Sequence, residues 1–165
     1  MGLRIFETDA DHTLAAWRNV LMMHWHGPVT MDAVQATHPA HDAVYAEYPR
    51  GLGVFVIVSD STPIPPTEVR QVSALIIRAT AGEVLCQCTI IEGGGFWGSA
   101  ARSAAAAINI LSRPPNPTRV FGEVEEAVAW QTPFLNYAGY SQEEFAAAAR
   151  DLRAISETAT ANVGT

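Results

Sequence analysis

The chain has little charge, little cysteine and no long apolar run. Only 16% of its 165 residues are charged, and 17 acidic against 10 basic side chains give a net charge of -7. An acidic surface repels phosphate backbones, which argues against nucleic acid as a partner. No apolar run approaches the roughly 20 residues that cross a bilayer. The first residues, MGLRIFETD, fit neither a signal peptide nor a myristoylation site. We therefore expect a cytoplasmic protein without a membrane span.

The two cysteines, Cys86 and Cys88, lie close together in the stretch VLCQCTII. Side chains two apart on a strand share a face, and neighbours on one strand are poorly placed for a disulfide. A lone C-x-C without a second pair is a weak zinc signal. We expect both residues to be reduced and buried as small apolar side chains.

Motifs for catalysis are also missing: the sequence has no nucleophile elbow, P-loop, H-E-x-x-H or kinase signature. Glycines at 93, 95 and 98 do spell G-x-G-x-x-G, between a strand-like and a helix-like run. A dinucleotide fingerprint normally opens the first strand-helix unit, whereas only one short strand follows here. Phe96 and Trp97 are bulky where a pyrophosphate would approach. We expect these glycines to permit positive φ in a tight turn, and we expect no cofactor and no enzyme activity.

Apolar runs alternate with helical patterns along most of the chain, and 48% of the residues are apolar. Strands are expected within 3–9, 19–27, 52–59, 83–92 and 118–122, with Trp17 and Arg18 in the connection between the first two. Helices are expected from Thr30 towards Tyr48, after TPIPP, from Ser99, and over 123–131. This alternation predicts an α/β fold with a mixed, mostly parallel sheet of about five strands.

Local signals mark several helix ends. Thr30 is a good N-cap, and Pro39 should interrupt or kink the first helix. Ser141 and Glu144 form a capping box that opens a last helix. The apolar stripe of that helix includes Phe145, Leu152 and Ile155. We expect one domain over 1–135, a C-terminal helix over 136–158 packed on it, and a flexible tail over 159–165.

Four stretches together are similar to a known family: HWHGPVTMD, GLGVFVIVSD, IIEGGGFWGSAARS and RVFGEVEEAVAWQ. They cover about residues 3–131 and resemble the STAS domain of anti-sigma factor antagonists, and more closely the SpoIIAA-like proteins. The resemblance implies a STAS-like fold with an added C-terminal helix. It also implies a non-enzymatic regulatory module that binds a protein partner. Because such domains are also likened to Sec14, the alternative is a small apolar ligand or lipid bound between sheet and helices.

STAS antagonists carry a phosphorylated Ser or Thr in a D-x-[ST]-G motif. In the matching stretch, SDSTPIPP, Asp60 and Thr62 occupy the aspartate and acceptor positions, and Pro63 replaces the glycine. The resemblance therefore implies a phospho-switch at Ser61 or Thr62. The alternative is an ordinary polar loop.

The candidate surface for a partner or ligand consists of Trp25, Phe96, Trp97 and Arg102. Phe96 and Trp97 are large and lie at a strand-helix junction, where loops usually reach the surface. The small side chains of Ala104 to Ala107 would let a second helix approach. We expect a homodimer through this region; if a ligand binds instead, Met22, Met31 and Phe96 would line its pocket with the two tryptophans.

Four histidines complete the candidate residues. His24 and His26 share a face of one strand, and His38 and His41 share a stripe of the following helix. If the pairs converged, they could hold a transition metal. The sequence supplies no obvious supporting carboxylate, and the spacing is not diagnostic. We expect separate histidines and no metal.

Overall fold

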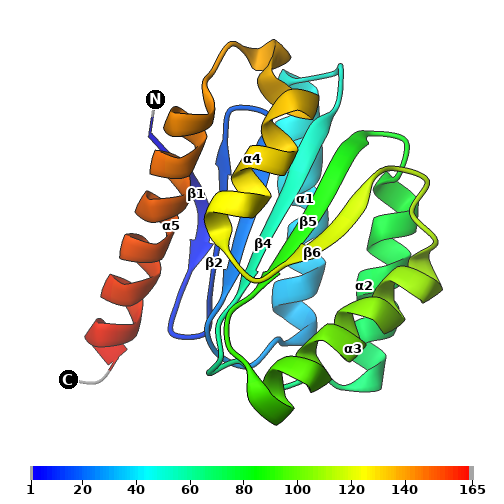
Figure 1. Cartoon of the computed structure of the whole chain (residues 1–165), viewed down its shortest axis with the longest axis vertical. Helices are drawn as coiled ribbons and strands as arrows, with labels where there is room; N and C mark the ends of the chain where they lie inside the picture. The colour runs from blue at the N-terminus through cyan, green and yellow to red at the C-terminus, as the bar shows by residue number, and fades with distance from the viewer. Residues whose placement is uncertain (1, 164–165) are drawn as a thin grey trace.

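The computed structural model describes residues 2–163 and has three layers, with a six-stranded sheet between two groups of helices (Figure 1). The strands are β1 (Arg4–Thr8), β2 (His12–Trp17), β3 (Val20–Trp25), β4 (Leu52–Val58), β5 (Val84–Ile91) and β6 (Thr118–Phe121). The helices are α1 (Met31–Glu47), α2 (Thr67–Thr80), α3 (Gly95–Ser112), α4 (Val124–Leu135), the short η1 (Asn136–Ala138) and α5 (Gln142–Val163). The predicted α/β class with a mixed, mostly parallel sheet is confirmed.

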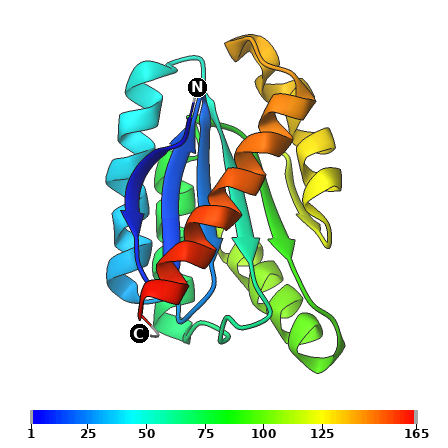
Figure 2. The same ribbon diagram turned by 90° about the vertical axis from the view of Figure 1, so that its left-hand side faces the viewer.

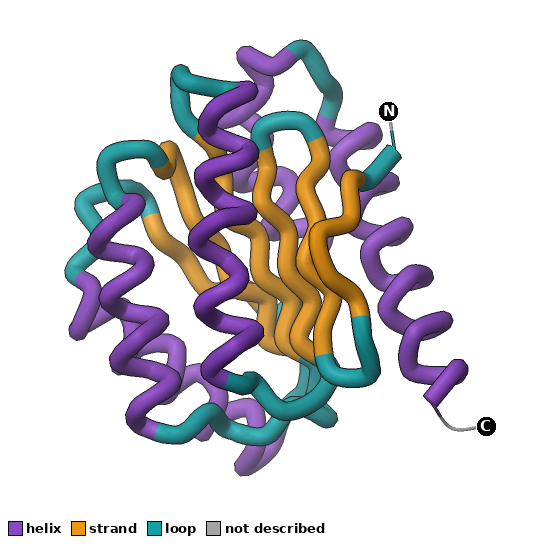
Figure 3. The backbone as a smooth tube through the Cα atoms, turned by 180° about the vertical axis from the view of Figure 1, so that it is seen from behind, coloured by secondary structure: helices purple, strands orange, loops and turns teal. Residues whose placement is uncertain are grey.

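Strand order follows the sequence from β1 to β6. The pairs β1–β2 and β2–β3 are antiparallel, and the other three pairs are parallel. When parallel strands follow one another in one direction, right-handed crossovers place every connecting helix on the same face. Accordingly α1, α2 and α3 cover one face (Figure 3). The opposite face receives α4 and α5, and α5 runs diagonally across it (Figure 2).

The sheet has one strand more than expected, and the difference lies at residues 10–18. β2 occupies part of this segment, which we expected to be a connection, and all six of its residues are buried. Its sequence, HTLAAW, has few of the β-branched residues that mark a strand. Trp17 therefore belongs to a strand, while Arg18 lies in the following turn with φ 51°.

Several local predictions hold. The Thr30 hydroxyl accepts a hydrogen bond from the Ala33 backbone at 3.2 Å, and Pro39 lies inside α1. α3 begins at Gly95, four residues before the expected Ser99. Positive φ at Gly93 (122°) and Gly95 (62°) confirms that these glycines serve a turn.

The last helix opens with the predicted capping box. The Ser141 backbone N–H donates to Glu144 Oε2 at 2.7 Å, and the Glu144 N–H donates to Ser141 Oγ at 3.2 Å. Phe145 and Leu152 are fully buried, whereas Ile155 is half-buried. The helix continues to Val163, so the expected tail is helical over 159–163. Residues 164 and 165 lie outside the described residues.

A compact apolar core fills the space between the sheet and α4–α5. Trp17 stacks on Phe145 at a centroid distance of 5.6 Å. Cys86 and Cys88 are free thiols in this core, as predicted. Gln131 of α4 is fully buried and donates Nε2–H to the Val54 carbonyl oxygen at 2.8 Å, which fixes α4 against the sheet. A second apolar core lies on the opposite face of the sheet, mainly under α1.

Candidate functional site

A cavity of about 190 Å³ lies between the sheet and helices α1, α2 and α3. Side chains two apart on a strand point to one face, and β3, β4 and β5 each contribute three of them: Leu21, Met23 and Trp25; Val54, Val56 and Val58; Gln87, Thr89 and Ile91. The side of α3 that faces them carries Ala101, Ala104 and Ala105. Because alanine side chains are too short to reach the sheet, space remains under this helix.

The loop after β4 closes the cavity at the carboxyl ends of the parallel strands. Thr62 in this loop is buried, and its hydroxyl donates to the Trp25 carbonyl oxygen at 2.8 Å. Trp97 Nε1–H donates to the Thr62 carbonyl oxygen, also at 2.8 Å. Trp25, Thr62 and Trp97 all line the cavity. This end of an open α/β sheet is where ligands usually bind.

Besides His41, three polar side chains in the cavity lining make no hydrogen bond within residues 2–163: Gln87, Thr89 and Asn109. Gln87 is only 8% exposed. By contrast, the Thr37 hydroxyl donates to the Val34 carbonyl oxygen of its own helix at 2.7 Å. Thr89 and Asn109 are half-buried, and all three side chains border the cavity. The three free side chains therefore favour a bound molecule that can hydrogen-bond to them.

The cavity lining carries almost no charge. Among its residues in the described chain there is no Asp, Glu or Arg, and His41 is the single titratable side chain. Burial lowers the pKa of His41, although Glu83 and Asp42 nearby oppose this shift. His41 is consequently neutral at pH 7, and a neutral ligand suits this lining.

The sheet separates the two histidine pairs, which therefore do not converge. His24 and His26 lie on the α5 side with ring centroids 5.2 Å apart, and Thr160 Oγ1 of α5 is 3.2 Å from His26 Nδ1. Burial lowers the pKa of His24 to about 4, and its Nε2 lies 2.7 Å from Ser59 Oγ. His38 and His41 belong to α1 on the other face.

The predicted partner or ligand surface divides into inward and outward residues. Trp25 is buried and Trp97 half-buried, and both line the cavity. Phe96 is 92% exposed, and Arg102 is exposed as well. The prediction that Met22 lines the same pocket is wrong, because Met22 belongs to the core on the α4–α5 side of the sheet.

Met31, the other methionine expected there, is half-buried and is not among the lining residues. Of the small residues expected to receive a second helix, Ala104 instead faces the cavity and Ala106 is exposed.

The two candidate phosphorylation sites differ in access. Ser61 is exposed, and its hydroxyl donates to the His26 carbonyl oxygen at 2.9 Å. Thr62 is 2% exposed, so a phosphate on it would require the loop to open. α2 begins only at Thr67, so its N-terminal amides are several residues away along the chain. Phosphorylation at either position stays a prediction.

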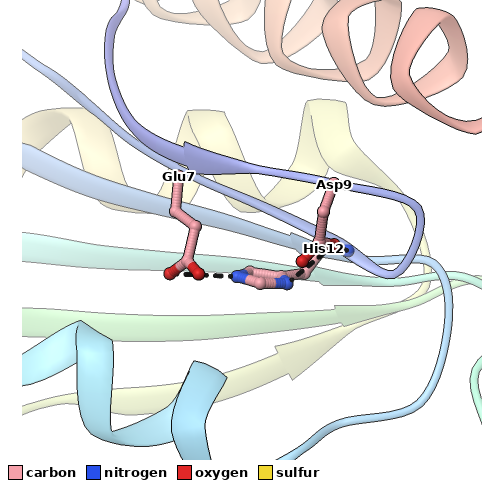
Figure 4. A group of neighbouring side chains, drawn as sticks. All are labelled: Glu7, Asp9 and His12. Atoms are coloured by element: carbon pink, nitrogen blue, oxygen red, sulfur yellow. Dashed lines mark hydrogen bonds and ion pairs between the residues drawn. The ribbon is translucent and has the colours of Figure 1, made fainter.

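A group that the sequence did not reveal lies on the β1–β2 hairpin and consists of Glu7, Asp9 and His12 (Figure 4). His12 Nε2 is 3.4 Å from Glu7 Oε2, and Nδ1 is 3.1 Å from Asp9 Oδ1. The same Asp9 oxygen accepts the backbone N–H groups of Asp11 and His12. Since the carboxylates contact different ring nitrogens, they orient the ring, which stacks on Trp25 at 5.2 Å.

Comparisons with known proteins add no identification. No family model matches the chain, and neither the curated proteins nor the solved structures yield a match. Within residues 2–163, no helix has the length and apolar character needed to cross a membrane.

Proposed function

We propose that this protein binds a small, neutral, mainly apolar molecule in the cavity under α3. The observation that carries the proposal is the combination of an apolar lining with three polar side chains that have no hydrogen-bond partner in the described chain. Largely apolar pockets with a few convergent polar groups are the usual form of small-molecule sites. The activity proposed is binding, without a catalytic step.

The cavity volume limits the size of the ligand. An engineered apolar cavity of about 150 Å³ holds benzene, so about 190 Å³ suits a single ring with a short substituent. Sites for drug-sized ligands measure about 300–1,000 Å³. The cavity therefore fits a compact molecule better than a two-chain lipid.

The polar groups define the other end of the ligand. The Gln87 side chain offers two N–H donors and a carbonyl acceptor, and Thr89 and Asn109 add further donors and acceptors. A wholly apolar ligand would leave the Gln87 amide unpaired, which costs free energy. A charged ligand would lose its hydration without gaining an ion pair. An alcohol, phenol or amide meets both conditions.

A matched series of one-ring compounds tests this function by isothermal titration calorimetry. Benzyl alcohol has a neutral polar end, toluene lacks one, and benzoate carries a charge. We expect benzyl alcohol to bind with one site, and toluene and benzoate to bind more weakly. Absence of binding for the whole series at millimolar concentration, or equal affinity for all three compounds, would contradict the proposal.

We propose a STAS-like partner-binding module as the second candidate. Besides the sequence resemblance, the surface of α2 and α3 favours it: Phe96, Ile110, Leu75 and Leu111 are exposed. Arg78 Nη2 donates to the Leu111 carbonyl oxygen at 2.6 Å, so the C-terminal parts of the two helices lie together. Exposed apolar side chains at both ends of α3 offer anchors to a partner that lies along this helix. If the partner is a second copy, sedimentation will show a dimer that Phe96→Ser with Ile110→Ser weakens; a monomer at high micromolar concentration excludes it.

A further inference from the structure

A second cluster of polar side chains lies where α1 meets the turn before β5. His41 Nδ1 is 3.3 Å from Glu83 Oε2 and 3.6 Å from Asp42 Oδ1. The ligand atoms of the three residues all lie within 4.8 Å of one another. His38 Nε2 lies 3.9 Å from the same Asp42 oxygen. Three groups that can each coordinate a cation thus surround one small volume, and His38 lies at its edge beside Asp42.

His41 is the unusual member of this cluster. Its side chain is 3% exposed, and neither ring nitrogen makes a hydrogen bond within the described residues. The Nδ1 atom faces two carboxylate oxygens, but no hydrogen bond of acceptable geometry joins them. A buried polar atom without a partner is costly, and a cation between the nitrogen and the two oxygens would satisfy all three.

The separations agree with the geometry of a tetrahedral metal centre. Zinc lies about 2.0–2.2 Å from nitrogen and oxygen ligands, and tetrahedral angles at these bond lengths place the ligand atoms about 3.3–3.6 Å apart. The distances from His41 Nδ1 to Glu83 and Asp42 fall in this range. A mixed nitrogen and oxygen set suits zinc and similar transition metals more than calcium or magnesium.

The backbone holds these ligands before any ion arrives. His41 and Asp42 follow His38 by three and four positions, so each lies one turn of α1 from it. Glu83 is fixed by its own N–H, which donates to the Thr80 carbonyl oxygen, and by its carbonyl oxygen, which accepts the Leu52 N–H, both at 3.0 Å. His38 and Asp42 are exposed, which leaves a route for the ion from solvent.

The hairpin cluster of Glu7, Asp9 and His12 is a useful contrast. Its carboxylates contact opposite ring nitrogens, and Asp9 already accepts two backbone N–H groups. In the α1 cluster both carboxylates face one nitrogen. We propose that His41, Asp42 and Glu83 form a three-ligand binding site for a divalent transition metal of the zinc class, with the fourth position left to water. This site is separate from the proposed ligand binding, although His41 also lines the cavity.

Zinc titration of the tag-free full chain, after treatment with a chelator, tests the site. We expect wild type to bind one zinc ion with micromolar or tighter affinity. Glu83→Gln keeps the shape of this half-exposed side chain but removes its charge. Loss of a group that only supports a metal ligand already lowers metal affinity by about tenfold or more, so we expect at least that loss for Glu83→Gln. The matched control, Glu7→Gln in the hairpin cluster, should leave the affinity unchanged. Cobalt in place of zinc should give the intense visible absorption of tetrahedral coordination.

Three results would overturn the site: no zinc binding by wild type at micromolar concentration, equal affinity in wild type and Glu83→Gln, or an equal loss in Glu7→Gln. Circular dichroism confirms that each variant is folded, and Asp42→Asn replaces Glu83→Gln if the latter is not. Benzyl alcohol binding should persist in Glu83→Gln, because Glu83 is not among the cavity-lining residues. Failure of the metal site is thereby distinguished from failure of the proposed function.

Discussion

Trp97 of α3 donates its indole N–H to the backbone carbonyl oxygen of Thr62, at 2.8 Å. This bond joins the start of α3 to the loop after β4, and the Thr62 hydroxyl continues the link to the Trp25 carbonyl oxygen. Trp97 and Thr62 thus meet at one end of the cavity. The sequence points to Trp97 as a surface aromatic and to Thr62 as a phosphate acceptor. The Trp97–Thr62 bond holds the start of α3 to the loop at this end of the cavity.

Replacing Trp97 by Phe should loosen the closed end of the cavity. The variant keeps an aromatic ring but loses the hydrogen bond, which contributes about 1 kcal/mol to the free energy of unfolding. We expect urea denaturation to show a loss of this size and stopped-flow exchange to show faster release of benzyl alcohol. Release at the wild-type rate would show that this bond does not control access.

Filling the cavity from α3 should abolish ligand binding. Ala104 is buried and faces the cavity, so the ring of Ala104→Phe would enter space that the ligand needs. Ala106 lies on the exposed side of the same helix and provides the matched control, Ala106→Phe. Calorimetry should detect benzyl alcohol binding in the control and none in Ala104→Phe. If a folded Ala104→Phe binds as well as wild type, the ligand occupies another place.

Acid should destabilise the protein through His24. Its pKa falls from 6.5 in the unfolded chain to about 4 in the fold because burial disfavours the charged ring. The unfolded chain therefore takes up this proton first, so stability is complete above pH 6.5 and is lost as the pH falls towards 4. The free energy of unfolding lost through His24 is at most about 3 kcal/mol. Urea denaturation across this range should show a shallower pH dependence for His24→Gln.

His26 and His41 also have lowered pKa values, so a part of the slope should remain in that variant. A wild-type stability that does not change between pH 6.5 and 4 would show that His24 is not buried in neutral form.

The two thiols should be inert in the native protein. Burial raises the pKa of Cys86 to about 12 and raises that of Cys88 as well, and alkylation requires the thiolate. Mass spectrometry after iodoacetamide treatment at mildly alkaline pH should show no adduct on native protein and two adducts in denaturant. Rapid modification of the native chain would indicate that this core opens readily.

Sequence periodicity was sufficient for most elements and insufficient for the cavity. Thr30, Ser141 and the glycine turn act through neighbours a few residues away, so the sequence alone identified them. The sequence pattern did not predict β2, because HTLAAW has weak strand propensity and the strand is stabilised by burial on both faces.

The cavity depends on contacts that are distant in the sequence. The alanines of α3 predict a surface for another helix, whereas the right-handed crossover in the fold turns some of them towards the sheet. In the sequence, Gln87 is the signal for a polar group in the cavity, since it interrupts the apolar run VLCQCTII with an amide. His41 and Glu83 are 42 positions apart, and only the fold shows that they meet.

The Gln87 side-chain amide provides the most direct measurement of the central claim. Its resonances in ¹⁵N-labelled protein can be followed by NMR during titration with benzyl alcohol, with exposed Gln35 of α1 as internal control. The account predicts a saturable shift of the Gln87 resonances, an unchanged Gln35 resonance, and no Gln87 shift in Ala104→Phe. Gln87 resonances that stay fixed while benzyl alcohol binds, or that shift equally in Ala104→Phe, would contradict it.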